Sequence, residues 1–189
     1  MFIVMNDNLR ARIKEIYYQQ VNNKAVFLFE NIPPKKLRNA RESYATTITE
    51  DETVILLYDD TVFGSAKEGF LLTTKRLYQK NLAEPPGALD VGRIESIALD
   101  DKTMHSNLVV KSGEYELHMA LIGHAKAERE ATLQLVDGIV RLLQGDSQAA
   151  GENQTTDEAQ VPRPKRCRNC GAGCIEFANH CEYCGTKIG

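Results

Sequence analysis

The residues of this chain best suited to chemistry are its cysteines, and all five lie between positions 167 and 189. Four of them form two matching pairs, Cys167-Arg-Asn-Cys170-Gly and Cys181-Glu-Tyr-Cys184-Gly. In such a loop two sulfur atoms turn around one ion, and two loops complete a tetrahedron with Zn–S bonds of about 2.3 Å. Because four thiolates leave no position for water, we expect a structural Zn²⁺ and not a catalytic metal.

The segment that carries these pairs, residues 163–189, is too short to fold through its apolar side chains alone. So small a piece buries little surface, and the metal would supply much of its folding free energy. Cysteine is absent from residues 1–166, and metal-ligand spacing accounts for four of the five thiols. This pattern favours a reducing compartment over a secreted disulfide scaffold, and we expect a cytoplasmic protein.

The composition gives little support for binding to membranes or to polyanions. The apolar start, Met1 to Met5, is too short for a signal peptide and has no preceding positive charge. No apolar run approaches the roughly 18 residues of a membrane-spanning helix, so we expect no integral membrane segment. The formal net charge of −3 argues against a general polyanion binder, although local basic patches remain possible.

Two helices are predicted in the first 48 residues. Asn6 or Asp7 can cap a helix that buries Leu9 and Ile13 on one face. Pro33-Pro34 can open a second helix, because proline is tolerated in a first turn. The face that this second helix would bury holds Leu37, Ala40, Arg41 and Tyr44. Between the two helices, the apolar run 26–29 is too short to assign from its pattern.

The spacing of Thr49 and Glu52 is that of a capping box, which indicates that the following residues 54–57 begin as a helix. From residue 58 to 120 the pattern changes to short apolar runs separated by glycines, which is typical of strands and turns. The predicted strands are 70–73, 77–80, 89–91, 94–99, 108–111 and 115–119. The last two form the clearest hairpin; Tyr115, Leu117 and Met119 should face the core, and Glu116 and His118 the solvent.

A long helix is predicted from about Gly123 to Gln144, with Gly145 placed to end it. Its apolar residues exceed what one sheet face requires, so some of them could contact a second subunit, although simple packing on a sheet is favoured. These residues are Leu133, Leu135, Val136, Ile139, Val140, Leu142 and Leu143. Residues 145–162 are acidic and lack lysine and arginine, which predicts a flexible linker with an r.m.s. span of roughly 20 to 25 Å.

The segment from Gly69 to Tyr78 contains an L-T-x-x-R-L turn at Leu72 to Leu77, and an I-x-S-I strand follows at Ile94 to Ile97. With the hairpin and closing helix, residues 50–144 resemble the bacterial PH-like and GRAM-like domains. That resemblance implies two bent antiparallel sheets packed orthogonally and capped by the last helix. It does not cover the helical region before residue 50.

The tail resembles the short zinc-ribbon family, in which C-x-x-C-G-A is followed by C-x-x-C-G-T. Two features depart from the family pattern, a fifth thiol at Cys174 and a histidine at His180 where an aromatic residue commonly stands. Either could in principle replace a ligand. The complete set of four paired cysteines favours Cys174 as a small free thiol and His180 as a packing side chain.

We therefore predict an α+β protein in four parts: a helical N-terminal segment 1–48, a PH-like β-domain 49–144, an acidic linker 145–162 and a zinc ribbon 163–189. Catalysis finds little support, because Asp59-Asp60 and Asp100-Asp101 sit beside turns and read as solvated acids. His105, His118 and His124 have no cysteine or serine partner in a recognisable motif. The function we expect is protein contact or self-association. The sequence does not identify a small-molecule ligand.

Weak nucleic-acid binding through the ribbon is the alternative function. It rests on the basic cluster Arg163, Lys165, Arg166 and Arg168. Contacts to phosphate release counterions, so about four basic residues would give weak, salt-sensitive binding. Membrane binding by the PH-like region has less support, because Lys67, Lys75, Arg76 and Lys80 are scattered among acidic residues and form no polybasic cluster.

Overall fold

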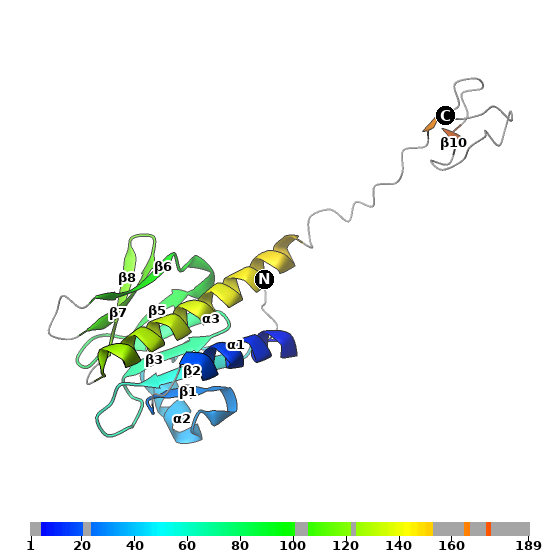
Figure 1. Cartoon of the computed structure of the whole chain (residues 1–189). Coiled ribbons are helices and arrows are strands. Elements are labelled where there is room, and N and C mark those ends of the chain that lie inside the picture. The colour runs from blue at the N-terminus through cyan, green and yellow to red at the C-terminus, as the bar shows by residue number, and fades with distance from the viewer. Residues whose placement is uncertain are drawn as a thin grey trace. The chain divides into compact units, whose positions relative to one another are not determined.

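The computed structural model describes residues 5–20, 24–100, 106–121, 124–152, 165–166 and 173–174. The chain divides into two compact units, Met1–Ala149 and Ala150–Gly189. The first unit combines helices with two antiparallel sheets and ends in a long helix (Figure 1). This arrangement confirms the predicted α+β class.

Both predicted N-terminal helices are present. Helix α1 spans Asp7–Gln20, and the side-chain oxygen of Asn6 accepts a hydrogen bond of 2.7 Å from the backbone N–H of Leu9. This bond satisfies one of the N–H groups that have no partner inside the helix. Helix α2 spans Pro34–Ser43 and buries Ala40, and Tyr44 is buried directly after it. Arg41 was expected on the same face, but its side chain is exposed.

The run between the helices forms strand β1, Val26–Leu28, followed by a short 3-10 turn at Phe29–Asn31. Strand β1 pairs antiparallel with β2, Val54–Asp59, and Val26 lies opposite Tyr58. The N-terminal residues therefore contribute a strand to the main sheet as well as two helices. Periodicity could not assign this strand because a three-residue run shows no period.

The larger sheet has the order β1-β2-β3-β4-β5, and all its strands are antiparallel to their neighbours. Strand β3 spans Gly69–Thr73, β4 spans Arg76–Lys80 and β5 spans Gly87–Asp90. The helical start predicted for residues 54–57 is wrong, because β2 begins at Val54. The Glu52 carboxylate does accept a hydrogen bond from the backbone N–H of Thr49, but it also accepts one from the Thr73 hydroxyl, which ties it to the sheet.

The smaller sheet has the order β6-β7-β8, with β6 at Ser96–Asp100, β7 at Asn107–Ser112 and β8 at Tyr115–Ala120. A second 3-10 turn, Val91–Arg93, connects the sheets along the chain. The predicted hairpin of β7 and β8 is confirmed, and Met119 is buried. Tyr115 was expected in the core, but it is 77% exposed, because it lies beside the turn at Gly113 where the hairpin leaves the core.

Helix α3 spans Lys126–Glu152, so the stop predicted at Gly145 is wrong. Gly145 meets nothing within 4 Å and does not have the left-handed backbone of a helix-ending glycine. The residues after it include glutamine and two alanines, which are good helix formers and continue the helix. The first part of the predicted linker is therefore helical, and residues 153–162 lie outside the described residues.

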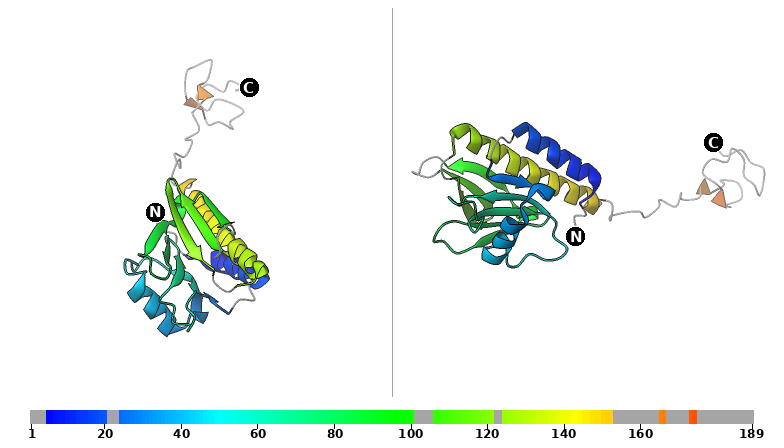
Figure 2. Two further views of the ribbon diagram at one scale, coloured as in Figure 1. Left: turned by 90° about the vertical axis from the view of Figure 1, so that its left-hand side faces the viewer. Right: turned by 90° about the horizontal axis from the view of Figure 1, so that it is seen from below.

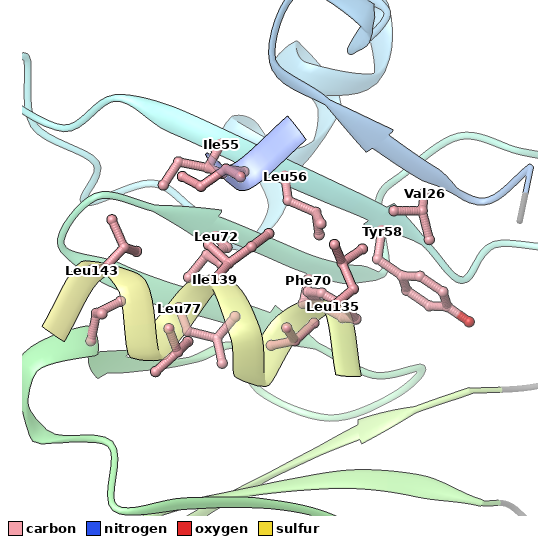
Figure 3. Packing of buried hydrophobic residues seen from close by; sticks show 14 of the residues in the cluster. Val26, Ile55, Leu56, Tyr58, Phe70, Leu72, Leu77, Leu135, Ile139 and Leu143 are labelled. Atoms are coloured by element: carbon pink, nitrogen blue, oxygen red, sulfur yellow. The ribbon is translucent and has the colours of Figure 1, made fainter. Parts of the chain in front are cut away.

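The inner face of the larger sheet packs against α3. Figure 3 shows Leu135, Ile139 and Leu143 of α3 among side chains of β2, β3 and β4. Helix α1 lies alongside α3 (Figure 2), and a Cβ on Gly138 would stand only 3.3 Å from Ile16. The apolar surplus of α3 is thus buried against α1 of the same chain, and a second subunit is not needed to cover it.

The outer face of the same sheet packs against α2. Leu57, Leu71 and Tyr78 form a second buried cluster with Ala40 and Tyr44. Strand β3 is consequently buried at every position. Its continuous apolar run is the pattern expected of a strand that is covered on both faces.

Candidate functional site

The predicted zinc ligands Cys167, Cys170, Cys181 and Cys184 lie outside the described residues, as does His180. The strands next to the first pair are described. Strand β9, Lys165–Arg166, pairs antiparallel with β10, Gly173–Cys174, and Arg166 lies opposite Gly173. The connection between these two strands is the stretch that contains Cys167 and Cys170.

Among the described residues, no group of three or more histidine, cysteine, aspartate or glutamate side chains could hold a metal ion. The helices in that part of the chain are also too short or too polar to cross a membrane.

The loop that connects β2 to β3 is organised around the side chain of Asp59. One oxygen of the Asp59 carboxylate accepts hydrogen bonds of 3.0 Å from the backbone N–H groups of Thr61 and Ala66. The Thr61 hydroxyl donates to the same oxygen, and the Lys36 ammonium pairs with the other. The Asp59 side chain is only 3% exposed, so these partners compensate for its burial.

The pKa of Asp59 reflects two opposing effects. Burial favours the neutral acid and raises the pKa, while hydrogen bonds from Lys36 and Thr61 favour the carboxylate and lower it. The hydrogen bonds dominate, and the pKa lies below its ordinary value. Asp59 was predicted to be a solvated turn acid, and that prediction is wrong, because its side chain points inward to organise the loop.

Helix α2 fixes the same loop from the outside. The Lys36 ammonium donates to the carbonyl of Gly64, the Asn39 amide donates to the carbonyl of Ser65 at 2.7 Å, and the Ser43 hydroxyl donates to the carbonyl of Lys67 at 2.7 Å. These three side chains lie on successive turns of α2. The helix thus sets the position of the loop backbone along much of its length.

At the tip of this loop, two neighbouring apolar side chains stand in solvent. Val62 is 91% exposed and Phe63 is 97% exposed. Gly64, the next residue, has a φ of +65°, which a glycine adopts without strain. We call Val62 and Phe63 the apolar tip. Sequence reasoning missed it, although an apolar pair between Asp60 and Gly64 was a visible signal.

The acids and histidines considered for catalysis do not form a catalytic group in the described part of the chain. His118 is exposed and lies 3.4 Å from Glu116, which agrees with its predicted solvent-facing position. Asp100 belongs to β6, whereas Asp101 and His105 lie outside the described residues.

His124 has an acidic neighbour, but this pair begins helix α3. Its Nδ1 lies 3.3 Å from the Glu128 carboxylate, which also accepts a hydrogen bond from the backbone N–H of Ala125. These contacts, the backbone bond first, hold the pKa of Glu128 below its ordinary value. The ring centroid of His124 lies 5.7 Å from that of Tyr58, whose pKa is raised far above its ordinary value by burial.

Comparisons of the chain with protein-family models, with curated proteins and with solved structures found no match.

Proposed function

We propose that this protein is a non-enzymatic cytoplasmic interaction protein that contacts a protein partner, or a second copy of itself, through the apolar tip of its first unit. In this proposal its tail is a zinc ribbon that serves as a second contact module. The observation that carries the proposal is the loop in which Asp59 and α2 hold Val62 and Phe63 in solvent.

The apolar tip has the physical features of a binding anchor. Transfer of a valine or phenylalanine side chain out of water is favourable, by roughly 1.5 to 3 kcal/mol for each residue. A flexible loop would bury such side chains against its own unit. Here the backbone is fixed by hydrogen bonds from both sides, so little conformational entropy remains to be lost when a partner binds. A large aromatic side chain that enters a partner's pocket is a frequent source of binding energy.

The strand order supports the PH-like part of the proposal. Strands β2 to β5 form consecutive antiparallel pairs, β6 to β8 form a second antiparallel sheet, and α3 follows. In this reading, α1, β1 and α2 are additions to the PH-like core. Helix α2 has a distinct use there, because its side chains hold the loop that carries the apolar tip.

The spacing of the cysteines supports the zinc ribbon, with Cys167, Cys170, Cys181 and Cys184 as ligands. A zinc ribbon holds a Cys-x-x-Cys pair at the turn of a short hairpin, and β9 and β10 flank the first pair in that way. Cys174 lies in β10 opposite Lys165, beyond the turn of the hairpin, which favours its assignment as a fifth thiol outside the ligand set.

The test of the apolar tip compares the full chain with the double variant Val62→Ser, Phe63→Ser. Light scattering during size-exclusion chromatography at increasing protein concentration measures self-association, and pull-down measures capture of a partner. We expect the double variant to lose the contact while it keeps its melting temperature, because both side chains stand in water. Leu82→Ser, at a residue that is 71% exposed on another loop, is the matched control.

The tip proposal fails if the double variant associates and captures partners as the unmodified chain does. It also fails if Leu82→Ser removes the contact equally, since general surface apolarity would then explain the binding. If the protein remains monomeric at high concentration, the proposal of self-association is excluded. The proposal of a contact with a different protein then remains.

The alternative function, weak nucleic-acid binding by the ribbon, is tested separately. The basic residues Lys165 and Arg166 form β9, and Arg168 follows two positions after Arg166 in the sequence. If they contact phosphates, affinity for an oligonucleotide will fall steeply with salt, and Arg166→Glu with Arg168→Glu will abolish it. Unchanged binding in that double variant counts against the alternative.

A further inference from the structure

A cavity of about 340 Å³ opens beside the other end of the β2–β3 loop, away from the apolar tip. Its lining residues are Asn39, Glu42, Ser43, Lys67 and Lys80. They come from three elements: the C-terminal half of α2, the loop and the end of strand β4. The cavity therefore lies where α2 covers the outer face of the larger sheet.

The polar groups of this cavity are fixed by hydrogen bonds. The Ser43 hydroxyl donates to the carbonyl of Lys67 and accepts from the ammonium of Lys80 at 3.3 Å. The Asn39 amide donates to Ser65, the residue two before Lys67 in the loop. Because Asp59 and α2 also hold this loop, the backbone that carries Lys67 is in place before any ligand arrives.

The charged residues that line the cavity are two lysines and one glutamate. Lys36, which lies one helical turn before Asn39 on α2, pairs with the carboxylate of Asp59. Lys67 and Lys80 have no such partner among the described residues, although both line the same cavity. Two lysines that line one concave site favour an anion that can accept hydrogen bonds from both.

We propose that this cavity binds a small phosphate monoester, with Lys67 and Lys80 holding the phosphate. The Asn39 amide and the Ser43 hydroxyl add neutral polar groups beside it. A phosphate monoester carries a charge of about −2 at pH 7, which matches two lysines, whereas a carboxylate carries a charge of −1. The inference does not depend on the apolar tip or on the zinc ribbon.

Glu42 makes the site more selective than a simple phosphate pocket. Glu42 lines the same cavity, and a carboxylate there repels a bare dianion but accepts a hydrogen bond from a hydroxyl group. The volume also leaves room for more than the phosphate. The ligand that fits both features is a phosphate monoester with a hydroxyl group near its ester carbon, such as glycerol 3-phosphate.

The test is a titration of the full chain with glycerol 3-phosphate, inorganic phosphate and sulfate at constant ionic strength. Backbone amide chemical shifts of Ser43, Lys67 and Lys80 report binding. We expect saturable shifts, with glycerol 3-phosphate bound more tightly than inorganic phosphate. Lys67→Gln and Lys80→Gln should each weaken binding about tenfold or more, because each removes a charged donor. Lys35→Gln, on the same helix but outside the cavity, should leave it unchanged.

Glu42→Gln tests the selectivity independently. It should strengthen binding of inorganic phosphate and reduce the preference for glycerol 3-phosphate, and a merely structural role for Glu42 would change neither. The proposal is overturned if the shifts do not saturate, if sulfate gives the same affinity as the monoester, or if Lys35→Gln weakens binding as much as the cavity variants. Thermal melts of each variant confirm that it is folded.

Discussion

The charge of Asp59 and the conformation of the β2–β3 loop depend on each other. The carboxylate is ionised because backbone and side-chain donors converge on it, and the loop is ordered because those donors have one acceptor. Asp59→Asn keeps the shape of the side chain but replaces an acceptor oxygen with an N–H donor. We expect a loss of about 1 to 3 kcal/mol in the free energy of unfolding at pH 7, measured by urea denaturation.

The effect of Asp59→Asn on stability should depend on pH. The folded-state pKa of Asp59 lies below its ordinary value of 3.8, so its ionised form stabilises the protein above about pH 4. This contribution is lost as the pH falls through the lower, folded-state pKa. The difference between Asp59→Asn and the unmodified chain should therefore be largest at neutral pH and shrink toward pH 3.

Individual residues were the hardest level to predict from the sequence. The pair Asp59-Asp60 reads as two turn acids, and nothing in the pattern separates the buried one from its neighbour. Tyr115 fits the alternation of its strand and is nevertheless exposed. Both outcomes depend on where a turn leaves the core, which is set by tertiary contacts and not by local periodicity.

Among the elements, the hairpin of β2 and β3 has one position where only glycine fits. Gly69 has a φ of +121°, and a Cβ there would stand 2.1 Å from the carbonyl oxygen of Tyr58. Gly69→Ala should destabilise the protein by at least about 2 kcal/mol in thermal or urea unfolding. Gly92→Ala, which meets no atom within 4 Å, should change stability by less than about 0.5 kcal/mol. Equal effects at both positions would contradict the geometry.

Helix α3 can be tested at the glycine where the sequence predicted its end. Because the helix continues through Gly145 and a Cβ there meets open space, Gly145→Ala should raise stability by up to about 1 kcal/mol and increase helicity in circular dichroism. If Gly145 instead ended the helix with a left-handed backbone, Gly145→Ala would lower the stability of the protein. Gly138→Ala should gain less, because its Cβ meets Ile16 at 3.3 Å.

Elements with a clear apolar pattern were predicted well, apart from the C-terminal end of α3. The helices α1 and α2, the strands β3 and β4 and the hairpin of β7 and β8 follow the expected ranges within a few residues. The wrong predictions came from motifs of only a few residues. The Thr49 and Glu52 spacing suggested a helix, but Glu52 serves the neighbouring strands, where the Tyr78 hydroxyl donates to it at 3.0 Å. A local motif cannot show that its side chain has a distant partner.

For the whole molecule, the proposed zinc site leads to a prediction about independence. Cys170→Ser and Cys184→Ser should each abolish stoichiometric zinc in elemental analysis of protein purified under reducing conditions. The melting transition of the first unit should be unchanged, because Met1–Ala149 forms a compact unit of its own. Cys174→Ser, at the thiol outside the proposed ligand set, is the control and should retain the metal.

Two results would contradict this prediction. One is protein without stoichiometric metal, or with these cysteines joined as native disulfides. The other is loss of the melting transition of the first unit in Cys170→Ser. The zinc site stays a prediction from the spacing of four cysteines, which a sequence can carry because a metal site depends on a few ligands and not on a large core.

The larger sheet is covered by α3 on one face and by α2 on the other. Strands β2 and β3 are buried at almost every position, so substitutions on them offer little surface for a new contact. Diversification among descendants of this chain should therefore be concentrated in the connections between strands. Libraries that seek altered partners would do best to randomise the 60–68 and 81–86 segments and leave the strands untouched.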